Sequence, residues 1–595
     1  MIIKILNENQ FIIGCDDRLL LKRMQGMMDG RKVRGYNKII IPLRSGPKIY
    51  RFKRYGIRWG EGAQKLVNSI LEDIKKRKAV IAKIKSQYGG DIKFDYNYRG
   101  SYIPMEHQKI LFNMMAYPNA SSVISDTGTC KTGPYLWAID KRIQRGEVKK
   151  ALVITLTDLK KNVLEEMKVQ VPHLSGVVLK NKTQATRVIN KNYKIKKKNV
   201  DYDIYIGNYE SMFSILDATP SGYFDMIVLD EAHRVGSPGS RQTKEIVRFA
   251  EGCKYKYILT ATLTSNNLMS FYMPFRFLGP DTVPYAKYGE FQGQFMHTVG
   301  GQDSHIWIPN DGAEEVVARI IGNMSVKFKK EDCLDLPPMI REKVLCDMAP
   351  KQAALYNSMK KDCVAIIEDM CKMCDKRGKC DMSCESTITA KNALVLTTKL
   401  QQIASGFYIN TRTTMTDDGK EIKEKNTITL EDNPKLRLLI QILNNIPSDK
   451  KVIIWAHYIR ALELIRSAIE KAFGSDKYLT CWGDSDAFDQ IQKFKDPQYR
   501  FLIGNQQKMG HGHNIQFSNY QIFFCNPYSY IKRDQAEGRQ YRKGQKLSVT
   551  AIDVMARSTI DELVLKALDK KVDLSLTLEQ WARVLKKGPD ALNIK

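Results

Sequence analysis

Long hydrophobic runs are missing from the 595-residue chain, since no stretch of about 18 apolar residues occurs anywhere in it. The apolar start at residues 1–6 is too short for the core of a secretory signal, and no small-residue cleavage site follows it. Twelve cysteines in a chain of this length do not indicate a disulfide scaffold. We therefore expect no membrane span and a reducing, cytoplasmic location.

Acidic residues are scarce relative to basic ones, at 65 against 94, which gives a net charge of +29. The excess is uneven, because the first 100 residues hold 23 basic and 9 acidic side chains. Proteins this basic usually bind a polyanion, since each phosphate that they neutralise releases condensed counterions. We interpret the charge as nucleic-acid contact. The alternative is a solvated basic face that serves only solubility.

Internal repeats and long low-complexity segments are also absent, so we expect several different globular domains. Short apolar runs between Gly and Pro residues, such as residues 39–41 and 49–50, predict a small sheet near the start, followed by a charged helix over 64–85 and a linker at Gly89-Gly90. The predicted segments are a basic N-terminal α+β module at 1–95, a first lobe at 96–330, a helical connector with a cysteine cluster at 331–430, a second lobe at 431–570 and a tail at 571–595.

Buried parallel strands explain two series of short apolar runs that alternate with helical segments. The predicted strands of the first series lie at 123–124, 151–154, 204–206, 226–229 and 257–259, and those of the second at 451–455, 501–503, 522–524 and 549–552. The fold class is therefore α/β, with two tandem parallel-sheet domains.

A phosphate-binding loop is predicted directly after the first of these strands. Its candidate nucleotide-binding residues are Asp126, Thr127, Gly128, Thr129, Cys130, Lys131 and Thr132. A helix starting near Thr132 would direct backbone amides at phosphates, Lys131 would neutralise their charge, and the Thr132 hydroxyl would bind Mg²⁺. The strict pattern requires Gly where Ser125 and Cys130 stand, and a Cβ at Cys130 would crowd the loop backbone. A plain strand–turn–helix corner is the alternative.

Two more motifs follow buried strands. Asp230 would hold the Mg²⁺ hydration shell, and Glu231, which precedes Ala232 and His233, would orient and deprotonate the attacking water. Thr260 and Thr262 would sense the metal and Glu231. In the second series, Arg539 and Arg542 would share a helix face and reach the γ-phosphate. The alternatives are a helix start, strand termination and a charged helix surface, respectively.

These motifs together resemble the Swi/Snf-related branch of helicase superfamily two, over roughly residues 100–570. The resemblance implies two RecA-like lobes, ATP and Mg²⁺ as cofactors, duplex DNA as partner, and Gln108 at the adenine. It extends to coupling residues in the second lobe, which are Gly512, Asn514, Gln535 and Gln545. Leu336-Pro337-Pro338 and Thr559-Ile560-Asp561-Glu562 also fit that branch, whereas Cys130 and Leu263 depart from it. The compact length is similar to viral or phage members, which would place the protein in the host cytoplasm.

Basic and aromatic residues alternate before Trp59, and this stretch resembles the HARP-like domain of annealing helicases. The candidate DNA-binding residues there are Arg51, Lys53, Arg54, Arg58 and Trp59. Tyr50, Phe52 and Tyr55 are further candidates for stacking on exposed bases.

Four cysteines within fourteen residues, Cys371, Cys374, Cys380 and Cys384, predict a structural Zn²⁺ site, because zinc takes four such soft ligands. An exposed loop with incidental thiols is the alternative.

The leading hypothesis is an ATP-driven translocase that remodels or anneals branched or duplex DNA. A strand-separating DNA or RNA helicase is the second hypothesis, and a nucleic-acid-binding scaffold with an impaired ATPase is the third. DNA is preferred to RNA only through the family resemblance.

Overall fold

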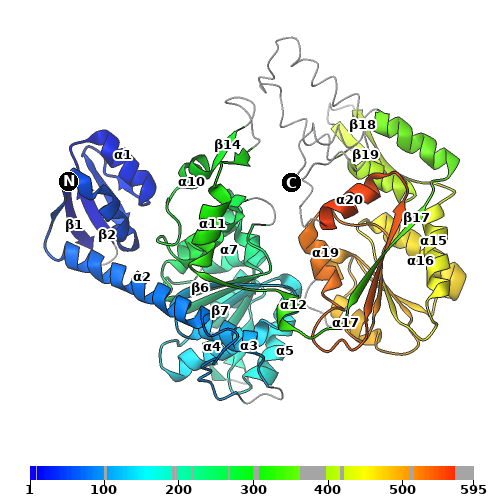
Figure 1. Ribbon diagram of the computed structural model, residues 1–595, viewed down its shortest axis with the longest axis horizontal. Coiled ribbons are helices and arrows are strands. Elements are labelled where there is room, and N and C mark those ends of the chain that lie inside the picture. The colour runs from blue at the N-terminus through cyan, green and yellow to red at the C-terminus, as the bar shows by residue number, and fades with distance from the viewer. Residues whose placement is uncertain are drawn as a thin grey trace, which may run out of the picture. The chain divides into compact units, whose positions relative to one another are not determined.

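The computed structural model describes residues 1–7, 10–98, 103–189, 194–195, 198–199, 201–217, 219–264, 268–298, 307–361, 395, 397–415, 421–509 and 515–569. The chain forms two compact units, Met1–His297 with Ile308–Cys333, and Thr298–Trp307 with Leu334–Lys595 (Figure 1). Within the described ranges, none of the helices combines the length and the apolar character that a bilayer crossing needs.

The first unit begins with a small α+β module. Its five-stranded sheet has the order β3-β4-β2-β1-β5, with strands β1 (Ile2–Asn7), β2 (Gln10–Gly14), β3 (Arg31–Lys32), β4 (Lys38–Pro42) and β5 (Arg58–Trp59). Helix α1 (Arg18–Met27) packs its Leu20, Leu21 and Met24 into the core of this module. The predicted small sheet is present, but residues 49–50 lie in the 3₁₀ helix η1 (Leu43–Tyr55) and not in a strand.

Helix α2 (Ala63–Lys85) joins the module to the first lobe (Figure 1). Ala63 and Val67 at its start belong to the core of the module, whereas Ile81 and Ile84 near its end belong to the core of the lobe. Arg77 pairs with Asp281 between these two ends. The helix predicted at 64–85 is therefore one continuous element shared by both parts.

The first lobe is a seven-stranded parallel sheet with helices around it. The strand order is β16 (Ser325–Phe328), β6 (Ala120–Ser125), β13 (Tyr255–Thr260), β12 (Met226–Asp230), β7 (Ala151–Thr155), β11 (Ile204–Asn208) and β8 (Gly176–Val178). Its helices include α3 (Glu106–Ala116), α4 (Thr132–Gln144), α5 (Lys160–Gln170), α7 (Tyr209–Asp217), α8 (Arg241–Ala250), α9 (Tyr272–Leu278), α10 (Tyr288–Phe295) and α11 (Ala313–Gly322). All five predicted strands are present.

The second lobe is a six-stranded parallel sheet in the order β17 (Met339–Cys346), β24 (Val549–Ala556), β23 (Tyr520–Phe523), β20 (Val452–Trp455), β22 (Phe501–Gly504) and β21 (Tyr478–Cys481). Its helices include α15 (Pro434–Asn445), α16 (Ile459–Phe473), α17 (Ala487–Lys493), α19 (Tyr530–Glu537) and α20 (Ile560–Asp569). The two predicted parallel-sheet domains, flanked by helices, are thus confirmed.

The segment 331–430, for which helices were predicted, supplies strands as well. Strand β17 forms the edge of the second sheet, and β18 (Phe407–Met415) pairs with β19 (Glu421–Thr429) in a hairpin. The charged sequence of β17 concealed it, since four of its eight residues are exposed on the sheet edge.

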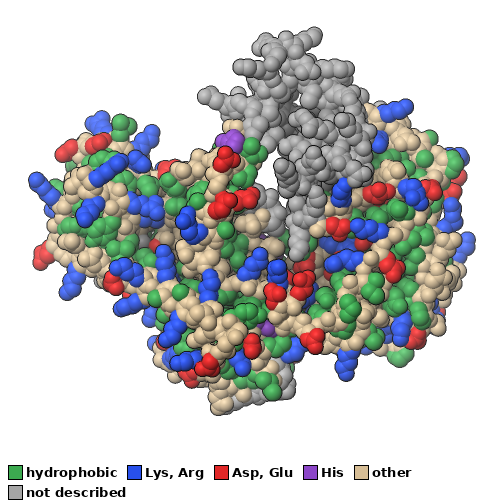
Figure 2. Space-filling view, viewed as in Figure 1, with side chains coloured by type: hydrophobic (Ala, Val, Ile, Leu, Met, Phe, Trp, Pro, Cys, Tyr) green, Lys and Arg blue, Asp and Glu red, His purple; other side chains and the backbone are tan. Residues whose placement is uncertain are grey.

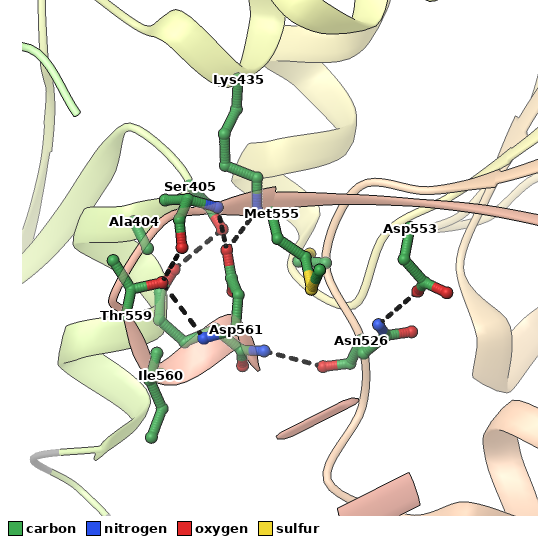
Figure 3. Close-up of polar contacts among 12 residues, drawn as sticks. Ala404, Ser405, Lys435, Asn526, Asp553, Met555, Thr559, Ile560 and Asp561 are labelled. Atoms are coloured by element: carbon green, nitrogen blue, oxygen red, sulfur yellow. Dashed lines mark hydrogen bonds and ion pairs between the residues drawn. The ribbon is translucent and has the colours of Figure 1, made fainter. Parts of the chain in front are cut away.

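A buried ion pair joins α15 to the first turn of α20, which follows the strand β24. Lys435 Nζ lies 2.7 Å from Asp561 Oδ2, and the two side chains are only 1% and 5% exposed (Figure 3). The Ala556 amide donates to the same carboxylate oxygen. Charges this deeply buried are stable only while they are paired, because each would otherwise be stripped of water without compensation.

We predict that Lys435→Met lowers the free energy of unfolding of the second lobe by about 3–5 kcal/mol, because it leaves the Asp561 carboxylate buried and unpaired. Adding Asp561→Asn should recover most of the loss. Urea unfolding followed through tryptophan fluorescence, to which the buried Trp455 of this lobe contributes, measures the loss. As a control, Arg557→Met breaks an exposed pair with Asp347 and should cost less than about 1 kcal/mol. Equal losses for the two single variants would contradict the prediction.

Candidate functional site

The candidate site lies where parallel strands of the first sheet end. Strands β6, β13, β12, β7 and β11 are neighbours in the sheet and run in the same direction. Their carboxyl ends therefore lie along one sheet edge, where open α/β sheets bind ligands. The predicted phosphate loop, Asp230 and Thr260 all follow or end these strands.

The predicted phosphate loop connects β6 to α4, which begins at Thr132 as expected. Side chains shape its interior. Ser125 Oγ lies 2.6 Å from Thr129 Oγ1, which donates to the carbonyl of Asp126 at 2.8 Å. Lys131 Nζ donates to the carbonyls of Ser125 and Asp126 at 2.7 and 3.2 Å. The Lys131 ammonium is therefore held inside the loop that is predicted to bind phosphates.

Two residues of the loop have backbone φ angles in the left-handed region. Gly128 has a φ of +85° and Cys130 a φ of +58°. Glycine adopts this conformation freely, whereas a side chain with a Cβ is strained in it. The strain at Cys130 therefore lies in its backbone dihedral, where crowding of the loop by its Cβ was expected.

Two side chains of helix α3 contact backbone carbonyls of the loop. Gln108 Nε2 donates to the Cys130 carbonyl at 3.1 Å, and its Oε1 accepts from the Met105 amide at 3.1 Å. His107 Nε2 lies 3.0 Å from the Thr129 carbonyl. Gln108, expected at the adenine, is completely buried and is joined to the phosphate loop itself.

Asp126 has an architectural contact. Its Oδ2 accepts from the Lys330 amide at 2.9 Å, and its own amide donates to the Phe328 carbonyl at 3.2 Å. These bonds tie the start of the loop to β16, the strand beside β6. Among the expected nucleotide-binding residues, Asp126 therefore uses its side chain to anchor the loop.

Asp230 is the last residue of β12 and is 8% exposed. Thr155 Oγ1 donates to its Oδ2 at 3.3 Å, and the Tyr209 hydroxyl donates to its backbone carbonyl at 2.7 Å. Burial, followed by the charge of Glu231, raises the pKa of Asp230 to about 6, although Lys131 opposes the shift. A desolvated carboxylate near an ammonium and a hydroxyl has the hard oxygen donor that Mg²⁺ prefers.

Glu231 also has a left-handed backbone, with φ of +57°. His233 Nδ1 lies 3.4 Å from Glu231 Oε2 and 3.4 Å from Thr260 Oγ1, which donates to the Thr262 carbonyl at 2.8 Å. The expected contact between Thr260 and Glu231 is therefore indirect, because the imidazole of His233 lies between them. Strain in such a residue is typical of functional positions.

A polar cluster that was not predicted lies after β7 and β11. Lys160 Nζ donates to Asn208 Oδ1 at 2.7 Å, while Asn208 Nδ2 and Arg234 Nη2 donate to Glu210 at 2.9 and 2.7 Å. Thr157 also donates to Glu210. These residues could have been predicted from their place in the sequence, because polar side chains that directly follow buried parallel strands lie at the same sheet edge as the site.

In the second lobe, the expectation that Arg539 and Arg542 share a helix face is wrong. Helix α19 ends at Glu537, and a turn begins at Gly538. The Arg539 amide bonds the Ala536 carbonyl at 3.1 Å, and its Nε donates to the Gln535 carbonyl at 2.9 Å. The two arginines therefore stand on a turn that continues from the helix.

The expected coupling residues of this lobe divide into two groups. Gln535 and Gln545 are both buried, and Gln545 Nε2 donates to the Ser518 carbonyl at 3.1 Å, which fixes the end of the arginine turn. Gly512 and Asn514 lie outside the described residues, as do the predicted zinc ligands Cys371, Cys374, Cys380 and Cys384. In the part of the chain that is described, no group of three or more His, Cys, Asp or Glu residues could hold a metal ion.

The basic stretch of the N-terminal module forms η1 and β5. Arg51, Lys53, Arg54 and Arg58 are exposed, and Lys and Arg side chains are scattered over the visible face of this module, among hydrophobic and other atoms (Figure 2). Phe52, by contrast, is 3% exposed and belongs to the core, so its expected stacking on bases is excluded. The helical turn, rather than a strand, directs it inward.

Trp59 is partly buried. It packs on Tyr50 with ring centroids 5.7 Å apart, and the Tyr50 hydroxyl bonds Asn68 of α2. Arg51 Nη1 donates to the Pro284 carbonyl of the first lobe at 3.2 Å. Lys53, Arg54 and Arg58 thus remain the exposed cations of the stretch that make no such contact with the lobe.

Comparisons with known proteins agree with the motifs. Protein p41 of Acyrthosiphon pisum secondary endosymbiont phage 1 is 22% identical over 79% of this chain and 96% of its own length. The ATP-dependent helicase YqhH of Bacillus subtilis, itself uncharacterized, is 21% identical over 80% of each chain. Protein CHROMATIN REMODELING 4 of Arabidopsis thaliana is 20% identical over 72% of this chain, which spans only 19% of that protein.

A solved Sulfolobus solfataricus SWI2/SNF2 ATPase core in complex with dsDNA is 21% identical, covers 84% of this chain and 99% of its own, and has a TM-score of 0.36. The SNF2-related domain matches residues 69–423, which begin inside α2 and leave the N-terminal module outside the match. This match spans more than half of the sequence and includes the phosphate loop, Asp230 and Thr260. The chain therefore belongs to the SNF2-related family.

Proposed function

We propose that the chain is an ATP-driven motor that translocates on duplex DNA and remodels or anneals branched structures. The observation that carries the proposal is the meeting, at one sheet edge, of the Lys131 loop, the buried Asp230 and the linked Glu231, His233 and Thr260. Phosphoryl transfer to water needs these parts: charge neutralisation, a metal-holding carboxylate and a base that orients the water.

In this proposal Lys131 would exchange the loop carbonyls for the β- and γ-phosphates, and Thr132 and Asp230 would hold Mg²⁺. The ion would neutralise charge that develops on the transferred phosphate. Glu231 would accept a proton from the attacking water, whose oxygen bonds the γ-phosphorus while the bond from that phosphorus to the leaving ADP oxygen breaks. His233, in contact with both Glu231 and Thr260, would link the two residues. Arg539 and Arg542 of the second lobe stabilise the transition-state charge.

DNA as the partner is supported by the net charge of +29 and by the exposed cations of the N-terminal module. Translocation is favoured over strand separation because the cycle of lobe closure and opening separates no base pairs. Single strands that activate ATP turnover better than duplex would instead favour the strand-separating helicase. Zinc held by the four cysteines of residues 371–384 remains a prediction.

We predict that Lys131→Ala lowers ATP turnover at least 100-fold while duplex DNA binding stays within about twofold, because the ammonium contacts phosphates of the nucleotide and not DNA. Phosphate release with saturating duplex and a fluorescence binding titration measure the two quantities. Lys244→Ala, on the exposed side of α8, is the matched control and should change neither. Undiminished turnover in Lys131→Ala would show that ATP is hydrolysed elsewhere.

We predict that Cys130→Gly raises ATP turnover and does not destabilise the fold. Removing the Cβ relieves roughly 1–2 kcal/mol of left-handed strain, which exceeds the roughly 0.5–1 kcal/mol that glycine costs through its flexibility. Cys130→Val should lower both properties, since a β-branched side chain tolerates positive φ poorly. Equal behaviour of the two variants would contradict the strain argument. An inactive wild type with an active Cys130→Gly would favour the scaffold alternative.

We predict that replacing Lys53, Arg54 and Arg58 together by Gln weakens duplex binding and lowers the slope of log affinity against log salt by about 2–3, since each lost phosphate contact is worth about 0.9. Titrations at several salt concentrations measure the slope. The matched control replaces three exposed lysines of the second lobe, Lys471, Lys493 and Lys495, by Gln, with the same change in net charge. If both triple variants reduce the slope equally, the module holds no specific phosphate contacts.

A further inference from the structure

A network of four charged side chains surrounds the start of the arginine turn in the second lobe. Arg533 forms a two-pronged ion pair with Asp553 of β24, Nη1 to Oδ1 at 2.5 Å and Nη2 to Oδ2 at 2.9 Å. Its Nε donates to Glu537 Oε1 at 2.7 Å. From the edge strand β17, Arg341 Nη2 donates to Glu537 Oε2 at 2.6 Å. Both carboxylate oxygens of Glu537 are therefore held, each by a different arginine.

Further contacts of Arg533 fix the orientation of α19, the helix that carries it. Arg533 also donates to Asn526 Oδ1 at 2.5 Å, and Asn526 Nδ2 donates to Asp553 Oδ1 at 2.7 Å (Figure 3). Its guanidinium lies 3.3 Å from the centre of the Phe523 ring. A planar guanidinium paired and stacked in this way has one orientation, which a lysine could not reproduce.

Glu537 is the last residue of α19, and its backbone begins the arginine turn. Its carbonyl accepts from the amides of Gln540 and Tyr541 at 3.3 and 3.1 Å. Glu537 therefore contributes twice: its side chain binds two arginines, and its carbonyl accepts the hydrogen bonds that form the turn with Arg539 and Arg542. Burial alone would raise the pKa of Glu537, but Arg533 and Arg341 outweigh it and lower that pKa, so the carboxylate is charged at neutral pH.

We propose that Arg341 and Arg533 are positioning residues, which hold Glu537 and through it set the direction of Arg539 and Arg542 for ATP hydrolysis. This inference rests on the proposed role of the two turn arginines. It assigns a function to the β17 edge strand, since β17 brings Arg341 to α19 from almost 200 residues away in the sequence.

Arg341 is the informative residue to change, because its side chain is 54% exposed, whereas that of Arg533 is buried. The same strand supplies a matched control. Lys343, two residues on and therefore on the same strand face, pairs with Asp569 of α20 at 2.9 Å and is 53% exposed. Both pairs tie β17 to a helix of the second lobe, but only that of Arg341 leads to the arginine turn.

The experiment measures duplex-stimulated ATP turnover over a range of ATP concentrations for Arg341→Ala, Arg341→Lys and Lys343→Ala, together with their melting temperatures. We expect Arg341→Ala to lower kcat about tenfold, since a small misplacement of a group that acts in the transition state is costly. The KM for ATP should stay within about twofold, because the affected contact forms in the transition state. Arg341→Lys should recover most of kcat, and Lys343→Ala should match wild type.

Equal kcat for Arg341→Ala and Lys343→Ala would overturn the inference, as would a lower melting temperature with unchanged kcat, or a raised KM alone. Arg542→Ala and Lys131→Ala, assayed beside them, separate this failure from that of the proposed function. If those two variants lose turnover and Arg341→Ala does not, only the positioning role fails. If Lys131→Ala and Arg542→Ala both keep wild-type turnover, the proposed function fails. If only Arg542→Ala keeps it, there is no arginine function to position and the inference falls alone.

Discussion

Parallel hydrogen bonding between β6, β13, β12, β7 and β11 is the constraint on which the candidate site depends. Strands that all run one way end at one edge, so segments that are far apart in the sequence meet there without needing long loops. Lys131, Thr155, Asp230 and Thr260 follow or end four different strands. Thr155 contacts Asp230 of the neighbouring strand, and Thr260 contacts His233, whereas Lys131 is held by carbonyls of its own loop. The candidate site residues lie at one edge of the sheet because its strands are parallel.

The second lobe achieves its order by a different means. Its sheet is also parallel, but two buried sets of charges, Lys435 with Asp561 and Arg533 with Asp553 and Glu537, fix helices α15, α19 and α20 against it. Buried ion pairs contribute little net stability, since desolvation offsets their attraction. Their value here is orientation, because a guanidinium or ammonium with fixed partners permits one placement of the helix.

Interior strands could be predicted from the sequence, whereas edge strands could not. The nine predicted strands are buried on both faces and show as continuous apolar runs. The four edge strands β16, β8, β17 and β21 are short or carry polar residues, so no run marks them. The ends of helices and the short turns were also not predictable from the sequence. Nothing in the spacing of Arg539 and Arg542 indicates that α19 ends at Glu537. Likewise, nothing in the alternation of basic and aromatic residues around Phe52 indicates a 3₁₀ helix. The phosphate loop and Asp230 were predictable because their chemistry fixes residue types, while His233 between Glu231 and Thr260 required coordinates.

Helix α2 gives the molecule a property that neither of its neighbours has alone. With its first turn in the core of the module and its last turns in the core of the lobe, its 23 residues make a rod of about 35 Å. Each residue of an α-helix turns the chain by about 100°, so the insertion or loss of one residue in its middle would rotate the module about this rod. The pairs of Arg77 with Asp281 and of Arg276 with Asp29 would then be separated. During evolution, therefore, the side chains of α2 are free to change over its exposed face, but its length is not.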